Sequence, residues 1–267
     1  MKFPQPLPQR RFCKRGPPRI RLENVTQPDY RTTGTPTDGR AMKLRHYYHV
    51  YADGKYRQIV SSHFAALNST GLIDELDSLH IGFVGNGGHV KEARQLVRHL
   101  TRRPFTSNVA SVGWEQETQD VLYRNATEAA EPFLALYAHT KGASSQTEIN
   151  ELWRYIMTRH TVRNWKHAIG AIRGNVAAAG CFWAPFDNGR LIGHAGGTQY
   201  FAGTFWWARS DAIARIGPPD RSVRYDAESW IGKITKLSKP FEVACLFDAP
   251  LELGSLRRHA AAMQLSE

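Results

Sequence analysis

From residue 46 onward, stretches typical of β-strands alternate along the chain with stretches typical of amphipathic helices. The strand-like runs are rich in β-branched, aromatic or small apolar residues, and most of them are separated by about 10–15 residues with apolar side chains at helical spacing. Strands joined by helices form βαβ units, in which the strands are parallel and helices cover both faces of the sheet. The chain is therefore predicted to fold as an α/β protein with a mostly parallel, Rossmann-type sheet.

The predicted elements follow from this alternation. Strands are expected at residues 46–51, 80–85, 107–112, 132–137, 177–183, 199–207 and 241–247, and helices at 56–70, 90–101, 115–130, 148–159, 162–173, 210–216 and 228–234. The strongest strand is Pro132-Phe-Leu-Ala-Leu-Tyr137. Because ligands of such sheets bind at the carboxyl ends of the strands, near the point where the strand order reverses, the loops after the strands are the places to look for a site.

Positive charge is concentrated at the beginning of the chain. The formal net charge is +11, and residues 1–44 carry ten Lys and Arg against three acidic residues. This segment is also rich in proline, so it cannot bury enough apolar surface to offset the entropy of ordering it. We predict a disordered basic arm over residues 1–44 and a single domain over residues 45–267. The arm either contacts a polyanion or an acidic partner, or is a solvated tail with no specific role.

Several classes of protein are excluded. No apolar run approaches the roughly 20 residues that cross a bilayer, and no signal peptide is recognisable at the N-terminus. The three cysteines, Cys13, Cys181 and Cys245, are too few and too scattered for a disulfide framework or a thiolate zinc site. We therefore expect a soluble, cytoplasmic protein without a membrane span. Serine-hydrolase, zinc-protease and EF-hand motifs are also absent from the sequence.

The first candidate site follows the strongest predicted strand, where the sequence reads His139-Thr-Lys141-Gly142. An imidazole and a cation at the carboxyl edge of a sheet can bind a diphosphate group. The alternative is a polar loop closed by a helix cap.

The second candidate is the run from Gly196 to Ala208, which concentrates glycines and aromatic residues next to His194. Aromatic faces stack on sugars or bases, and glycines let a ligand approach the backbone. Trp206 and Trp207 are neighbours on a predicted strand and so point to opposite faces. One of them is expected in the core, and the other is the candidate platform for a ligand.

The third candidate is a pair of carboxylates, Asp226 and Glu228, before a predicted amphipathic helix. A carboxylate at this place either caps the helix or acts as a general base that takes the proton of an acceptor hydroxyl.

Taken together and in order, these stretches resemble a group of bacterial and phage glycosyltransferase-like proteins. That group carries the patterns YxHIY, YxHTKG, WRxxM, GNFWWA and ExWIG. The matching stretches here are Tyr47-Tyr-His-Val-Tyr51, Ser69-Thr-Gly-Leu72, Ile81-Gly-Phe-Val-Gly85, Tyr137-Ala-His-Thr-Lys-Gly142, Trp153-Arg154 with Met157, Gly203-Thr-Phe-Trp-Trp-Ala208 and Glu228-Ser-Trp-Ile-Gly232.

The resemblance implies a GT-A-like fold and transfer of a sugar from a nucleoside-diphosphate donor to an acceptor hydroxyl. The implied donor-binding residues are His139, Lys141, Gly142 and Tyr51. The residues implied to line the sugar and acceptor site are Gly203, Thr204, Trp206, Trp207 and His194. Glu228 would be the catalytic base, with Asp226 as the second choice. The acceptor would be a protein, a cell-surface glycan or a modified DNA base, and a phage protein would act in the cytoplasm of its host.

Two departures from the group's pattern matter. Thr204 stands where the group has Asn, so one polar contact to the sugar differs. No Asp-x-Asp occurs in the chain, although this motif normally holds the Mn²⁺ or Mg²⁺ that neutralises the leaving diphosphate. Either another carboxylate holds the metal, or cations such as Lys141 replace it, or the site is inactive. The alternative function is accordingly a non-catalytic nucleic-acid-binding or assembly protein with a degenerate glycosyltransferase fold.

Overall fold

The computed structural model describes residues 42–145, 147–185 and 199–265. Most of the predicted N-terminal arm and the candidate residue His194 lie outside these ranges. The first strand begins at Lys43, so the last two residues of the predicted arm belong to the folded body.

The strands of the described ranges are β1 (Lys43–Tyr51), β2 (Ser78–Val84), β3 (Thr106–Ala110), β4 (Phe133–His139), β5 (Val176–Cys181), β6 (Trp183–Pro185), β7 (Gln199–Phe201), β8 (Trp206–Arg209) and β9 (Glu242–Phe247). The α-helices are α1 (Tyr56–Ser69), α2 (Leu72–Glu75), α3 (Gly87–Leu100), α4 (Gln116–Thr127), α5 (Glu148–Thr158), α6 (Trp165–Gly170), α7 (Ser210–Ile213), α8 (Asp226–Ser229) and α9 (Leu253–Gln264). A π-helical turn (Arg159–Arg163) follows α5, and a 3₁₀-helix (Trp230–Lys236) follows α8.

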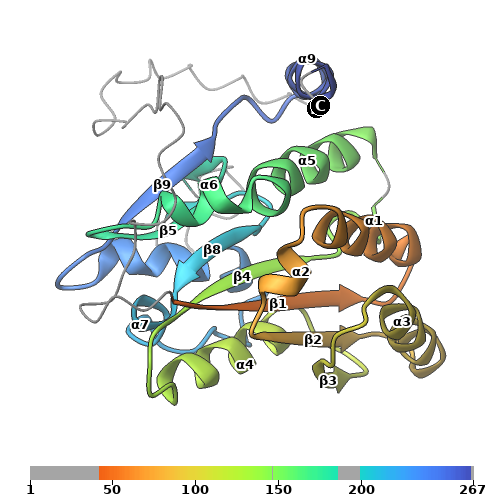
Figure 1. The fold of residues 1–267 in the computed structure, drawn as a ribbon, viewed down its shortest axis with the longest axis horizontal. Coiled ribbons are helices and arrows are strands. Elements are labelled where there is room, and N and C mark those ends of the chain that lie inside the picture. Colours follow the sequence, from red (N-terminus) through yellow and green to blue (C-terminus); the bar gives the residue numbers. More distant parts are fainter. Residues whose placement is uncertain (1–41, 146, 186–198, 266–267) are drawn as a thin grey trace, which may run out of the picture.

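A seven-stranded sheet with the order β3-β2-β1-β4-β8-β5-β9 forms the centre of the molecule (Figure 1). All neighbouring pairs are parallel except those of β8, which runs antiparallel to both β4 and β5. The predicted fold class, a mostly parallel α/β sheet, is confirmed. The strand order proceeds from β1 to β2 and β3 on one side and then resumes with β4 on the other. The topological switch point therefore lies between β1 and β4.

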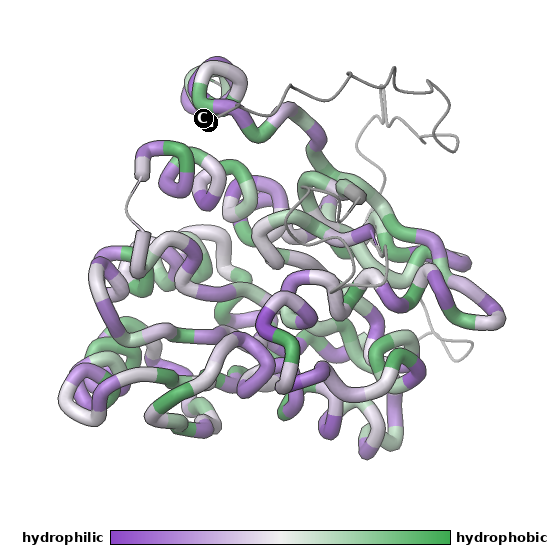
Figure 2. The backbone as a smooth tube through the Cα atoms, turned by 180° about the vertical axis from the view of Figure 1, so that it is seen from behind, coloured by the Kyte–Doolittle hydropathy of each residue, from purple (hydrophilic) through white to green (hydrophobic). Residues whose placement is uncertain are grey.

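Helices cover both faces of this sheet, and each face has its own core. On one face, side chains from α1, α2, α3 and α5 pack against the strands, with Leu256 of α9 at the margin. On the other face, the core is built from α4, α7 and the 3₁₀-helix. Figure 2 shows hydrophobic and hydrophilic colours alternating along the helices, as expected for amphipathic helices on a sheet. Within the described ranges, no helix is long and apolar enough to cross a membrane.

Several features differ from the prediction, among them the division of the predicted strand 177–183 into β5 and β6, which pairs with β7 in a separate two-stranded sheet. The predicted strand 199–207 is two strands, because Gly203 and Thr204 both adopt the left-handed conformation, with φ of +88° and +57°. The backbone N–H of Thr204 donates to the carbonyl of Phe201, which closes a turn between β7 and β8. The C-terminal helix α9 was not expected, because it buries only a few small or apolar side chains and no side chain caps its N-terminus.

Candidate active site

The switch point between β1 and β4 carries a tightly bonded loop. The backbone N–H of Tyr51, at the end of β1, donates to Oγ1 of Thr140 over 2.9 Å. In return, the backbone N–H of Thr140 donates to the carbonyl of His49 over 3.0 Å. The segment that follows β4 is thereby fixed beside the end of β1, at the place where ligands of open α/β sheets bind.

His139, the last residue of β4, is buried between two hydrogen-bond acceptors. Its Nδ1 lies 3.2 Å from Oε1 of Glu115, and its Nε2 lies 2.9 Å from the carbonyl oxygen of Gly203. Oγ1 of Thr204 is 3.3 Å from the same Nε2. A carboxylate and a carbonyl can only accept, so the ring satisfies both when each nitrogen carries a hydrogen. His139 therefore links α4, β4 and the turn between β7 and β8.

Glu115 immediately precedes α4 and was not among the predicted site residues. Burial acts to raise the pKa of its carboxyl, but the hydrogen bond and the charge of His139 outweigh this and hold the pKa far below its usual range. The backbone carbonyl of Glu115 also faces the hydroxyl of Tyr137, at 3.4 Å. The sequence did offer one signal: a carboxylate following the third predicted strand stands at the same edge of the sheet as His139.

His49, on β1, is a second imidazole beside this pair. Its Nδ1 lies 2.9 Å from Oγ1 of Thr118 on α4. Burial lowers the pKa of His49 to about 4, so the ring is neutral near pH 7. A neutral histidine beside the contact between His139 and Glu115 anchors α4 to the sheet without adding charge to the site.

Lys141 lies two residues beyond His139, and its ammonium is 4.3 Å from the ring centre of Trp153 on α5. The neighbouring Arg154 donates from its guanidinium to the backbone carbonyl of Lys141 over 2.8 Å. Gly142, with φ of +82°, turns the chain back toward this helix. Two cations are thus gathered at the carboxyl end of β4, as a diphosphate-binding loop requires.

The turn after β7 packs closely against α5. A Cβ placed on Gly203 would lie 2.5 Å from Sδ of Met157 and 3.0 Å from Nε1 of Trp153. The same indole therefore contacts Lys141 on its face and Gly203 at its nitrogen. Residues from three of the motif stretches named above, in the 137–142, 153–157 and 203–208 segments, converge at this point.

The two tryptophans of β8 do not form a ligand platform. They point to opposite faces as predicted, but both are fully buried. Trp206 stacks on Tyr137 in one core, and Nε1 of Trp207 donates to the carbonyl of Thr161 over 2.7 Å in the other. The expectation that one of them is exposed for a sugar is wrong, because β8 lies inside the sheet, between β4 and β5, and both of its faces are covered. Thr204 is also buried, and its hydroxyl faces His139.

Exposed aromatic side chains stand elsewhere at this end of the sheet. Tyr51, which ends β1, is 37% exposed, and Trp114, next to Glu115, is 42% exposed. Tyr51 was predicted as a donor-binding residue, whereas Trp114 was not singled out. Both are available to stack on a base or a sugar.

Asp226 and Glu228, the two candidate bases, have different surroundings. Asp226 is buried, and its carboxylate accepts from Nζ of Lys233 at 2.8 Å and from the backbone N–H of Asp220 at 2.7 Å. It is therefore a structural anchor, and its candidacy as a base is not supported. Glu228 is half-buried beside Tyr200 of β7, where burial and the charge of Glu228 raise the pKa of the phenol to about 12.

The segment that holds Glu228 is tied to the helix that follows Glu115. The side-chain amide of Gln116 donates to the carbonyls of Val223 and Arg224 at 2.9 and 3.1 Å, and that of Gln119 donates to the carbonyl of Ala227 at 2.8 Å. These bonds fix α8 against the first turn of α4.

Mn²⁺ or Mg²⁺ was considered as a cofactor because of the family resemblance. In the described part of the chain, no group of three or more His, Cys, Asp or Glu side chains could hold a metal ion. Residues 177–180, where the missing Asp-x-Asp was sought, form the buried strand β5. The donor set that this metal needs is therefore not offered by the described residues.

Comparisons with known proteins give no family for this chain. No protein-family model matches it, and no curated protein matches it. Among solved structures, it is similar to 4-diphosphocytidyl-2C-methyl-D-erythritol synthase, with a TM-score of 0.40, 11% identity, and 85% of this chain and 98% of that chain covered.

Two further similar structures come from mycobacteria. The Rv0371C protein of Mycobacterium tuberculosis H37Rv, solved in complex with manganese, has a TM-score of 0.37 at 12% identity, with 78% of this chain and 89% of that chain covered. Its homologue from Mycobacterium sp. strain JC1 has a TM-score of 0.34 at 14% identity, with 84% of this chain and 98% of that chain covered. None of these similarities assigns an activity to this chain.

Proposed function

We propose that this protein is a glycosyltransferase that moves a sugar from a nucleoside-diphosphate sugar to an acceptor hydroxyl. The observation that carries the proposal is the gathering of Lys141, Arg154 and the His139–Glu115 pair at the switch point of the sheet, against the turn at Gly203. This is the position at which open α/β sheets bind nucleotides.

The two cations would hold the donor diphosphate. When the bond between the sugar carbon and the diphosphate oxygen breaks, its electron pair leaves with the diphosphate, whose negative charge grows. Lys141 and Arg154 would stabilise that charge, as cationic side chains do for phosphoryl groups elsewhere. The indole of Trp153 holds the ammonium of Lys141 in place by a cation–π contact, so the charge is ordered before the donor arrives.

The nucleoside would lie over the exposed aromatic side chains at the same edge. Tyr51 stands at the end of β1, and its backbone is bonded to the loop that carries Lys141. Trp114 stands beside Glu115, on the side of β3. Stacking of a base on one of these rings would orient the donor without a metal ion.

Glu228 would serve as the base. The acceptor oxygen forms its bond to the sugar carbon and loses its proton, which passes to the Glu228 carboxylate. The buried Asp226 is already bonded to Lys233 and to the backbone, so among the two late carboxylates only Glu228 is free for this role in the described structure.

The test is the thermal stability of the full chain against a panel of nucleoside-diphosphate sugars, each with and without Mn²⁺. A ligand at 100 times its dissociation constant adds about 2.7 kcal/mol to the free energy of unfolding, so a true donor raises the melting temperature measurably. We expect a rise with one donor class. No rise with any donor in either condition would overturn the proposal.

A pair of lysine variants tests the assigned diphosphate contact. Lys141→Met removes the ammonium above Trp153 and should abolish most of the donor-induced rise. Lys166→Met is the matched control, because Lys166 also lies over an indole, that of Trp165 at 5.4 Å, but away from the switch point. Equal responses of the two variants to the donor would remove Lys141 from the site.

A further inference from the structure

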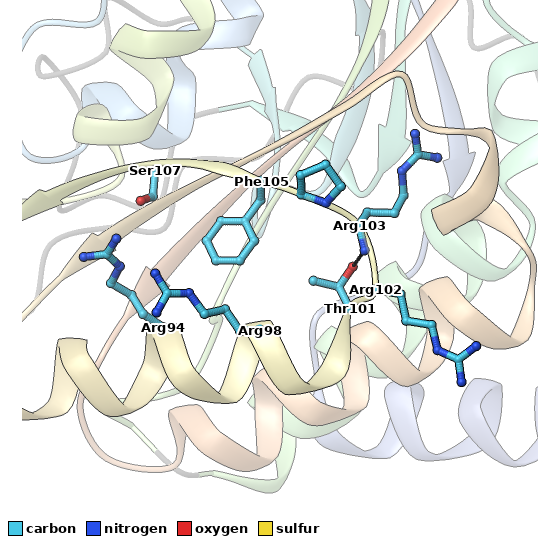
Figure 3. A pocket seen from close by; sticks show the side chains of 8 residues that line it. Arg94, Arg98, Thr101, Arg102, Arg103, Phe105 and Ser107 are labelled. Carbon is cyan, nitrogen blue, oxygen red and sulfur yellow. Dashed lines mark hydrogen bonds between the residues drawn. The ribbon is translucent and has the colours of Figure 1, made fainter.

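A basic groove runs between α3 and the edge strand β3, outside the site described above. It consists of two cavities of about 450 and 270 Å³ that share Arg94 and Arg98 in their walls. Figure 3 shows both guanidinium groups extending from α3 toward Phe105 and Ser107, the segment that enters and forms β3. Because the two cavities share a wall, the groove is elongated rather than a closed pocket.

One wall of the groove is a row of cations on α3. Lys91, Arg94 and Arg98 follow one another at intervals of three or four residues on α3, so they lie on the same face of the helix, and Arg102 lines the larger cavity just beyond the end of α3. At a rise of about 1.5 Å per residue, the three cations on the helix span about 10 Å. No carboxylate lines either cavity, and within the described part of the chain none of these four side chains has an ion-pair partner. The row is therefore a track of unneutralised positive charge.

The opposite wall is less polar. Phe105, Ser107 and Val109 alternate along the edge strand and line the groove, and Val109 is 53% exposed. An apolar side chain so exposed beside a row of cations is an unusual surface, since the groove offers both charge and apolar contact along one line.

We propose that this groove binds a single strand of nucleic acid, with its phosphates along α3 and its bases against β3. Guanidinium groups pair with phosphates in bidentate geometry, and proteins that bind single strands combine a positively charged groove along the backbone with side chains that contact the bases. The bases of a single strand are free to lie on Phe105 and Val109. A duplex hides the faces of its bases, and the Asp and Glu side chains of an acidic peptide end in charged groups that gain nothing from the apolar wall, so both fit the surface less well.

This inference stands independently of the proposed transferase activity. The groove begins at Gly87, directly after the carboxyl end of β2, and leads away from the switch point along α3. A strand bound there would reach the same edge of the sheet as the candidate active site, whether or not that site transfers sugar.

The test is fluorescence anisotropy of a labelled thymidine oligonucleotide with the full chain, over a series of salt concentrations. The groove variant is Lys91→Gln/Arg98→Gln/Arg102→Gln, which removes three exposed cations and leaves the half-buried Arg94 in place. The control variant is Arg163→Gln/Lys166→Gln/Arg173→Gln, which removes one lysine and two arginines that are also exposed but lie outside the groove. Both variants keep the basic N-terminal segment, so its contribution to binding is common to them.

We expect the groove variant to bind more weakly and the control variant to bind like the unmodified chain. The association constant K falls with salt, and loss of three phosphate contacts makes the negative slope of log K against log salt less steep by about 2 for a single strand. Melting temperatures of both variants verify folding, and Arg98→Gln alone provides a milder version if the triple groove variant is unstable. Equal binding by the groove and control variants would overturn the proposal. It would also be overturned if polyglutamate or a DNA duplex displaced the labelled oligonucleotide as effectively as the unlabelled single strand does at the same concentration.

Discussion

Nδ1 of His139 and Oε1 of Glu115 are 3.2 Å apart, although the two residues come from different elements of the fold. Because Nε2 of the same ring faces the carbonyl of Gly203 at 2.9 Å, the imidazole connects the start of α4 to the turn before β8. A single buried side chain thus fixes the relative positions of three segments that surround the candidate site.

Glu115→Gln tests this link directly. The amide keeps the size of the side chain but removes its charge, so the charge-assisted bond to His139 is replaced by a weaker one. We expect a loss of about 1–3 kcal/mol in the free energy of unfolding, measured in urea. Glu117→Gln is the control, because the Glu117 carboxylate pairs with the exposed guanidinium of Arg221 rather than with a buried imidazole, and its loss should cost less than about 1 kcal/mol. A larger loss for Glu117→Gln than for Glu115→Gln would contradict the structural role assigned here.

Gly203→Ala tests the close approach between the β7–β8 turn and α5. The new Cβ would lie 2.5 Å from Sδ of the buried Met157, in a backbone conformation with φ of +88°. We expect a loss of about 1–3 kcal/mol from the forced repacking, in addition to about 1 kcal/mol for the left-handed backbone. Gly71→Ala, at φ of +69° with no atom within 4 Å, should show the backbone cost alone. If the two variants melt at the same temperature, the packing at Gly203 is looser than described.

Buried histidines should make the protein sensitive to acid. Burial lowers the pKa of His46, His49 and His160 to about 4, from an ordinary value of 6.5, and lowers that of His63 well below 6.5. The unfolded chain binds these protons near pH 6.5 and the folded protein does not. Stability is therefore fully present above pH 6.5 and is lost as the pH falls toward 4, by up to about 1.4 kcal/mol per pH unit for each such histidine.

The measurement is the free energy of unfolding in urea at a series of pH values between 8 and 4. His46 and His63 face each other with their Nε2 atoms 2.9 Å apart, and Nδ1 of His46 faces the carbonyl of Leu136. Only one hydrogen fits between the two Nε2 atoms, and it belongs to His63 because His46 carries its hydrogen on Nδ1; protonation of His46 at Nε2 therefore breaks the contact. A free energy of unfolding that stays constant from pH 7 to pH 4.5 would show that these rings are accessible to protons in the folded state.

The sequence predicts the general fold and part of the site, and the reason differs from residue to residue. His139 and Lys141 could be placed because they directly follow the most strongly patterned strand, and the end of a parallel strand is a fixed location in the fold. Glu115 could not be paired with His139, because a contact between side chains on separate elements leaves no local pattern. One of Trp206 and Trp207 was expected to be available to ligands, but only the strand order shows that β8 lies between two other strands and is covered on both faces.

The variants Glu228→Gln and Asp226→Asn distinguish a carboxylate that acts in catalysis from one that stabilises the fold. Asp226 is buried with its carboxylate bonded to Lys233 and to the backbone N–H of Asp220, so Asp226→Asn should lower the free energy of unfolding by about 2 kcal/mol. Glu228 has no such partners in the described structure, and Glu228→Gln should leave stability nearly unchanged.

With the donor found in the thermal panel, Glu228→Gln should bind that donor normally and transfer its sugar at least about a hundredfold more slowly, because the acceptor proton has no base to receive it. Transfer at the normal rate by this variant would remove Glu228 from the mechanism, and the carboxylate of Glu115 would then be the next one to test.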